Sequence, residues 1–262
     1  MGFSIYAQRI LCDKVKLFFV ILLMIIPMLD IGQILYDLYS IPEEQIPDPR
    51  YVAFSALFTV GTNHMLYRIM FWFLPVYMLI ITGEDSLEDI DTGYRNILRS
   101  RMSKKQYAWG KARNSFGFSF LVIFLSLMLN YVLLQIFFHN GEYIWIPADL
   151  YPSEEHRIYT IGYDHPVAVN LVNITMISVL SGLIGMIGTC LSMSLQDRKI
   201  VYGITFMLWF IFVLIDDGLM SLFHPFTNMT LERFVIAVLL VIIGYLAISV
   251  TALIAEVKSD EI

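Results

Sequence analysis

The chain has 262 residues, of which 58% are hydrophobic and 15% charged, and its mean hydropathy is +0.69. A single soluble core of this size buries much less apolar surface, so the composition excludes an ordinary soluble domain and predicts a protein embedded in lipid. The formal net charge is −6, and no nucleic-acid partner is expected.

The first sixteen residues are expected to form a helix on the membrane surface. Apolar and charged side chains are interspersed in this segment, and the hydrophobic run that follows lacks the small-residue pattern of a signal-peptide cleavage site. We therefore predict an uncleaved interfacial helix over residues 1–16. The two cysteines, Cys12 and Cys190, are predicted to lie at different depths, where they form neither a disulfide nor a metal site.

Six later segments are each apolar enough to cross a hydrocarbon layer about 30 Å thick, which takes roughly 20 residues of helix. Because backbone groups in lipid must be satisfied within the chain, each segment is predicted to be helical. The fold class is therefore all-α, a polytopic membrane protein with six transmembrane helices in a single domain over residues 1–262. The predicted spans are residues 17–37, 66–82, 115–138, 167–193, 201–222 and 233–255.

The distribution of basic residues predicts the orientation. An even number of spans returns the chain to its starting side, and most of the 17 Lys and Arg residues fall on that side. Since basic residues are enriched in cytoplasmic segments, we predict a multi-pass plasma-membrane protein with both termini in the cytoplasm. The exceptions, on the outer side, are Arg50, Arg68, Arg157 and Arg233.

The first predicted span contains an acid, Asp30, and Gln33 and Asp37 follow on roughly the same helical face. A carboxylate within a span is costly unless it is paired, hydrated or protonated. Two interpretations stay open: these side chains reach toward the outer interface, or they line a path for cargo.

Between the second and third predicted spans lies a polar segment in which five acids precede seven bases. This pattern predicts a short structured surface for a soluble partner. An alternative is that the bases lie against anionic lipid, but that alternative does not explain the acids. The acids are Glu84, Asp85, Glu88, Asp89 and Asp91, and the bases are Arg95, Arg99, Arg101, Lys104, Lys105, Lys111 and Arg113.

Small and amide residues within the later spans predict close helix packing. Side chains without bulk let helices approach in lipid, and amides form hydrogen bonds between helices. The small residues are Ser178, Ser181, Gly182, Gly185 and Gly188, and the amides are Asn130, Gln135, Asn170 and Asn173.

Motifs of catalysis are absent from the sequence. It contains no phosphate-binding loop G-x-x-x-x-G-K-[ST], no H-E-x-x-H and no G-x-S-x-G. We therefore predict that the chain is not an enzyme and holds no cofactor or metal of its own.

The run from Asp91 to Lys111 reads Asp-Thr-Gly-Tyr-Arg-Asn-Ile-Leu-Arg-Ser-Arg-Met-Ser-Lys-Lys-Gln-Tyr-Ala-Trp-Gly-Lys and leads into the third predicted span. It resembles the permease subunits of type 2 ABC exporters, in which an acid, a Gly/Thr pair, a short helix, an Arg-Pro-Ser or Arg-x-Ser turn, a basic pair, an aromatic residue and a lysine follow one another. The matching residues are Gly93, Arg101, Ser103, Lys104, Tyr107 and Lys111. Met102 departs from the proline of many relatives.

The resemblance implies a coupling helix around Leu87 to Leu98 that docks into a cleft of a cytoplasmic ABC ATPase. It also implies two such ATPase subunits, which bind ATP and Mg²⁺, and a second permease that is an identical copy or a paralogue. Apolar side chains would enter the docking cleft and charges would orient it. The expected docking residues are Glu84, Asp85, Leu87, Glu88, Ile90, Asp91, Gly93, Tyr94, Ile97, Leu98, Arg101, Lys104, Tyr107 and Lys111.

The expected function is that of the permease subunit of an ATP-driven exporter that moves an amphipathic or antimicrobial-type peptide outward. Two alternatives from other classes remain. One is an ion-coupled secondary transporter or channel that uses Asp30. The other is a membrane peptide sensor or immunity protein that binds through its Tyr- and Trp-containing outer loop and transports nothing.

Overall fold

A computed structural model describes residues 2–40, 65–137, 158, 161, 165–214, 219–223 and 229–258, and over these residues the chain is built from helices. This confirms the all-α class. The predicted outer stretches 38–65 and 139–166 lie almost entirely outside the described residues. In chain order the helices are α1 (Phe3–Cys12), α2 (Lys14–Ser40), α3 (Met65–Trp72), α4 (Leu74–Met78), the π-helix η3 (Leu79–Gly83), α5 (Glu84–Asp91), α6 (Tyr94–Arg101), α7 (Lys104–Phe137), α9 (Pro166–Leu195), α10 (Arg198–Leu214), α11 (Leu219–Leu222) and α12 (Leu231–Lys258).

Within the described part of the chain, three helices are long and apolar enough to cross a membrane. They are Lys104–Phe137, Val167–Leu195 and Leu231–Lys258, and they contain or overlap the predicted third, fourth and sixth spans. The first predicted span lies within α2. The second is divided among α3, α4 and η3, and α10 ends at Leu214, before the predicted end of the fifth. Length and composition thus establish a membrane-associated helical protein with three candidate spans, fewer than the six expected.

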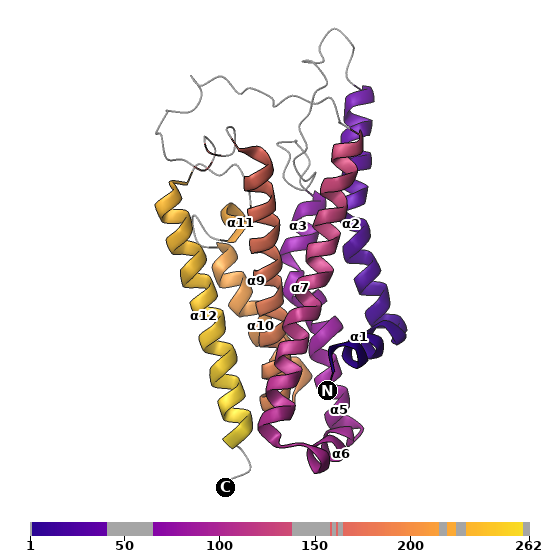
Figure 1. The fold of residues 1–262 in the computed structure, drawn as a ribbon, viewed down its shortest axis with the longest axis vertical. Coiled ribbons are helices and arrows are strands. Elements are labelled where there is room, and N and C mark those ends of the chain that lie inside the picture. Colours follow the sequence, from indigo (N-terminus) through magenta and orange to yellow (C-terminus); the bar gives the residue numbers. More distant parts are fainter. Residues whose placement is uncertain are drawn as a thin grey trace.

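The helices form an elongated bundle around α9, which contacts α7, α12, α10 and α4 (Figure 1). The short helix α1 runs across the bundle axis, beside α5 and α6. The C-terminal end of α12 lies at the same end of the molecule. We call this the charged end, because α5, α6 and the start of α7 bring their acids and bases there.

The close packing predicted for the small residues of α9 is confirmed. A Cβ atom added at Gly182 would lie 2.9 Å from ring carbons of Phe116 on α7, and one at Gly188 would lie 2.7 Å from Leu79 Cδ2 on η3. The Ser115 hydroxyl donates a hydrogen bond to the Gly185 carbonyl at 2.8 Å. Side chains of α7 and η3 thereby pack directly on the bare backbone of α9 at the centre of the bundle.

A proline inside α2 is compensated by α7. Pro27 has no N–H to donate to the Leu23 carbonyl, and the Ser126 hydroxyl donates to that carbonyl at 2.6 Å instead. The Asn130 amide donates to the Pro27 carbonyl at 2.6 Å. On α9, Asn173 donates to the Leu222 carbonyl at 3.3 Å. The predicted role in hydrogen bonds between separate elements is therefore confirmed for Asn130 and Asn173.

Side-chain caps set two helix starts at the charged end. The Asp13 carboxylate accepts from the backbone N–H groups of Val15 at 2.8 Å and Lys16 at 3.2 Å, so α2 begins at Lys14. The first helix therefore ends at Cys12, and the expected end at residue 16 is wrong. Ser103 and Gln106 form a reciprocal capping box, with both bonds at 3.2 Å, that starts α7.

Candidate functional site

The segment expected to be one coupling helix is a pair of helices at the charged end. Gly93 adopts φ +70°, a left-handed conformation that glycine reaches at little cost, and it separates α5 from α6. The prediction of a single helix from Leu87 to Leu98 is therefore wrong. The two short helices follow η3 and precede α7, at the place in the chain where the sequence predicts a partner surface.

Three acids of α5, Asp85, Glu88 and Asp89, are paired with bases from three other helices. Lys111 of α7 is 2% exposed and forms ion pairs with Asp85, at 2.6 Å, and with Asp89. Arg9 of α1 lies 3.0 Å from Asp85 and 2.7 Å from Asp89. In α2, Lys16 lies 2.6 Å from Glu88. These three bases and three acids form a charge-balanced group that we call the Lys111 cluster.

Burial makes the pairing within the Lys111 cluster obligatory. The side chains of Asp85 and Asp89 are 1% and 0% exposed, and an unpaired carboxylate at such a position is strongly disfavoured. Burial by itself raises the pKa of Asp89, but the Lys111 charge and the Arg9 hydrogen bond outweigh it and hold the pKa below its ordinary value. Burial lowers the pKa of Arg9, yet the two aspartates bring it above its ordinary value. Both groups are therefore charged at neutral pH.

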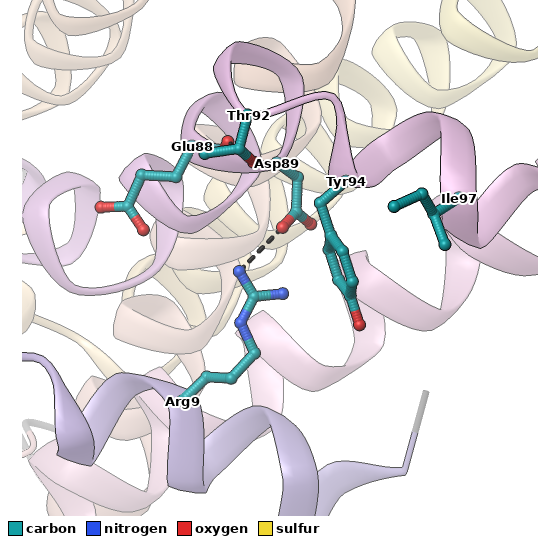
Figure 2. A pocket seen from close by; sticks show the side chains of 6 residues that line it. All are labelled: Arg9, Glu88, Asp89, Thr92, Tyr94 and Ile97. Carbon is teal, nitrogen blue, oxygen red and sulfur yellow. Dashed lines mark hydrogen bonds and ion pairs between the residues drawn. The ribbon is translucent and has the colours of Figure 1, made fainter.

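Figure 2 shows how α1 meets α5 and α6 at one edge of this cluster. Arg9 points at the Asp89 carboxylate, and its guanidinium lies 5.3 Å from the ring centroid of Tyr94. An open surface cleft lies beside this contact. Its lining residues are Arg9, Glu88, Asp89, Thr92, Tyr94 and Ile97. The cleft therefore joins α1, α5 and α6 on one accessible face.

A second buried group connects α6 to the end of α12. Glu256 is 1% exposed and forms ion pairs with both Arg95 and Arg99. These arginines are separated by four residues and therefore lie on one face of α6. The sequence pattern predicts that Arg95 and Arg99 belong to a partner surface, but in the structure they hold two helices of the same chain together.

The outermost acids pair with α10. Arg198 lies 3.1 Å from Glu84 and 2.8 Å from Asp91, and the Tyr202 hydroxyl donates to Glu84 at 3.0 Å. All five acids of the segment thus have partners within the chain. Three of them, Glu84, Glu88 and Asp91, keep partial or full exposure.

The structure separates the expected docking residues into buried and accessible groups. Leu87 is 2% exposed and Tyr107 is 3% exposed, so neither offers its side chain to a partner. Tyr94 and Ile97 are 38% and 53% exposed on α6. Arg101 is also exposed, and the half-buried members of the set are Glu84, Glu88, Ile90, Gly93, Leu98 and Lys104. The accessible apolar surface is therefore on α6.

The sequence does not indicate the partners on α1, α2 and α12. No sequence pattern connects Arg9, Lys16 and Glu256 to the polar segment, because they lie more than 70 residues from their partners in the chain. The one available signal is the excess of acids, since five carboxylates in a short segment between apolar spans call for partners. The proposed cargo residues Asp30, Gln33 and Asp37 lie on α2, and their side chains fall outside the described residues.

No group of three or more His, Cys, Asp or Glu side chains suited to a metal ion occurs within the ranges that the structure describes. The acids at the charged end instead bind Lys and Arg side chains. These ion pairs hold α5 and α6 at a defined position relative to α1, α7 and α12.

Comparison with known proteins gives one informative similarity. The chain is 33% identical over 258 residues to the uncharacterized protein YybM of Bacillus subtilis (strain 168), and the match covers 98% of each chain. No protein-family model matches the sequence, and no solved structure matches it.

Proposed function

The chain belongs to the same family as the uncharacterized protein YybM of Bacillus subtilis, and we propose that it is the membrane permease subunit of an ATP-driven exporter. In this proposal the chain crosses the plasma membrane six times, with both termini in the cytoplasm. A separate ABC ATPase docks on the charged end. The cargo is an amphipathic or antimicrobial-type peptide that moves outward.

The observation that carries the proposal is the position of α5 and α6. The two helices lie between the second and third predicted spans, at the end that also holds α1 and the end of α12 (Figure 1). They present exposed apolar side chains, Tyr94 and Ile97, beside an open cleft. Aromatic and aliphatic side chains of this kind are the usual anchors of protein interfaces. A soluble partner would find its contact surface here.

Buried ion pairs support a mechanical role for the same helices. The Lys111 cluster connects α5 to α1, α2 and α7, and Glu256 connects α6 to α12. Because separating these buried charges is costly, a displacement of α5 and α6 would displace the attached ends of α2, α7 and α12. An ATPase that closes around ATP could in this way move several long helices at once.

The six-span topology is consistent with the course of the chain. Three long apolar helices satisfy the requirements of a span directly. In the region of the second predicted span, α3, α4 and η3 follow one another with one intervening residue between α3 and α4. The first helix, α1, and the C-terminal end of the last helix, α12, both lie at the charged end (Figure 1), as an even number of crossings requires.

The ATP chemistry belongs to the partner in this proposal. Two ATPase subunits would bind ATP and Mg²⁺, and a second permease, identical or paralogous, would complete the transport path. The chain's own residues would bind the ATPase through α6 and transmit its motion through the Lys111 cluster.

Co-purification with an ABC ATPase tests the proposal. The chain is co-expressed with candidate ATPases of the same genome, beginning with any encoded beside it, and purified through a tag on the chain. Ile97→Asp and Tyr94→Asp, at exposed positions, are expected to lose the ATPase while the variant still inserts in membranes. Leu87→Asp is not suitable, because Leu87 is buried and its replacement would unfold the site.

Lys199→Glu serves as the charge control, since Lys199 is exposed at the start of α10, outside the expected docking residues. It is expected to retain the ATPase. Stimulated ATP hydrolysis together with peptide uptake into inverted vesicles would support export. Failure of every ATPase to bind the wild-type chain, or full binding to the Ile97→Asp variant, would contradict the proposal.

A further inference from the structure

Five of the seven basic residues between 95 and 113 fall into two kinds. Arg95, Arg99 and Lys111 are held in buried ion pairs with acids of the same chain. Lys105 and Arg113 are exposed, and among the described residues neither has an acidic partner within ion-pair distance. Within the described part of the chain, folding therefore leaves Lys105 and Arg113 of α7 without an acid, and their charge is available to a molecule outside the chain.

These two cations belong to one continuous row along α7. Residues four apart in a helix are neighbours offset by about 40° around its axis, so the row is a ridge that winds around α7, and Lys105, Trp109 and Arg113 share one side of the helix. The ridge continues through Gly117 to Leu121. The Trp109 side chain is 46% exposed and that of Leu121 is 39% exposed. The next members of the row, Leu125 and Leu129, are 51% and 45% exposed. The row thus changes from cationic and aromatic side chains before Gly117 to exposed aliphatic side chains beyond it.

The change of character occurs where α1 crosses α7. A Cβ atom at Gly117 would lie 3.2 Å from Cε2 of Phe3, so the Phe3 ring packs on the bare glycine backbone. One turn further along α1, Tyr6 packs edge-on against Phe118 with ring centroids 6.4 Å apart. Since α1 runs across the bundle axis (Figure 1), it separates the cationic part of the row from the aliphatic part.

We propose that Lys105, Trp109 and Arg113 form a binding site for the headgroup of an anionic phospholipid. The aliphatic part of the row faces the acyl chains, the tryptophan lies at the level of the interface where indole rings are favoured, and the two cations bind the phosphate. The two positive charges of the site are complementary to an anionic headgroup, and no acid among the described residues forms an ion pair with them. This inference rests on the proposed insertion of the chain in a membrane, and it is independent of any ATPase.

The fluorescence of Trp109 provides the test. Full-length protein is reconstituted in vesicles of brominated phosphatidylcholine, which quenches tryptophans in contact with lipid, and increasing amounts of unbrominated phosphatidylglycerol are added. The signal of Trp109 is the difference between wild type and the Trp109→Phe variant. Relief of quenching reports replacement of phosphatidylcholine by the anionic lipid at this site.

Wild-type protein is expected to prefer phosphatidylglycerol at Trp109. Each cation near an anionic surface contributes roughly fivefold to affinity, so Lys105→Gln/Arg113→Gln is expected to lower the preference by about 30-fold. The control Lys14→Gln/Lys199→Gln removes the same charge from exposed positions outside the row and is expected to leave the preference unchanged.

Three results would overturn the inference. They are an equal preference in the Lys105→Gln/Arg113→Gln variant, no preference in the wild type, and absence of lipid quenching at Trp109, which would instead indicate a surface covered by protein. Flotation of the wild-type protein with neutral phosphatidylcholine vesicles after carbonate washing tests membrane insertion by itself. A chain that inserts but shows no preference for phosphatidylglycerol refutes the headgroup site and leaves the proposed permease intact.

Discussion

Replacing Lys111 by methionine removes the base on which the two buried aspartates of α5 converge. Methionine keeps the unbranched shape of the side chain and is one atom shorter, but it has no charge, so Asp85 and Asp89 lose a partner at 1% and 0% exposure. Breaking a buried ion pair by removing one member costs about 3–5 kcal/mol. Arg9 remains at 3.0 Å and 2.7 Å from the two carboxylates, which places the expected loss near the lower limit, about 3 kcal/mol.

A loss of this size is measurable as a change in melting temperature. In chains of roughly this size 1 kcal/mol corresponds to about 2–4 °C, so Lys111→Met is expected to melt about 6–12 °C below the wild type in detergent micelles. The measurement is the loss of the monodisperse peak on size-exclusion chromatography after heating. Lys199→Met, at an exposed position with no ion pair to any described residue, is expected to change stability by no more than about 0.5 kcal/mol.

A double variant tests whether the effect comes from the buried charge. Lys111→Met together with Asp85→Asn removes one base and one acid, which restores charge balance in the Lys111 cluster. The double variant is expected to be more stable than the sum of the two single changes predicts, by about 1 kcal/mol or more. If Lys111→Met melts with the wild type, or if the two changes are simply additive, the ion pairs do not carry the attachment of α5.

Three further predictions concern other contacts. Glu256→Gln is expected to speed amide hydrogen exchange in α6 by about tenfold or more, because hydrogen bonds to a charged group contribute roughly 1.5–3 kcal/mol; unchanged exchange would contradict the role of Glu256 in holding α6. Gly182→Ala is expected to destabilise the bundle by about 1–3 kcal/mol through its clash with Phe116, whereas Gly244→Ala, with no atom within 4 Å, is expected to be neutral or stabilising in the same melting assay. Folding lowers the pKa of Asp89, so this carboxylate stabilises the fold at pH values above its unfolded pKa of about 3.9. The stabilisation is expected to be lost as the pH falls through the lower pKa of the folded state. A wild-type melting temperature that is no more sensitive to acid than that of Asp89→Asn would refute this.

Several local features could be predicted from residue types alone, because the interactions that produce them are short in sequence. Apolar runs of sufficient length predict helices wherever the backbone must satisfy its own hydrogen bonds, and α7, α9 and α12 are the outcome. Glycines at helical spacing predict the close contact of α9 with its neighbours. The Ser103 and Gln106 pair carries the signal of a helix start, which the structure shows as a capping box.

The role of the charges was decided by tertiary structure. Sequence patterns showed acids followed by bases between two apolar segments and predicted an exposed surface, since charged side chains are seldom buried without partners. The partners are Arg9, Lys16 and Glu256, which lie 72 to 161 residues away in the chain, and only the packing of α1, α2 and α12 brings them to α5 and α6.

The same packing determines which groups remain available to other molecules. Lys105 and Lys111 are equivalent in sequence terms, but one is exposed on α7 and the other is buried between two aspartates. Hydrophobicity and helical periodicity are properties of neighbouring residues, so the sequence determined that this chain is a helical membrane protein with a charged segment between apolar helices. Burial and charge pairing depend on distant residues, so folding in three dimensions was needed to separate the buried ion pairs from the free cations.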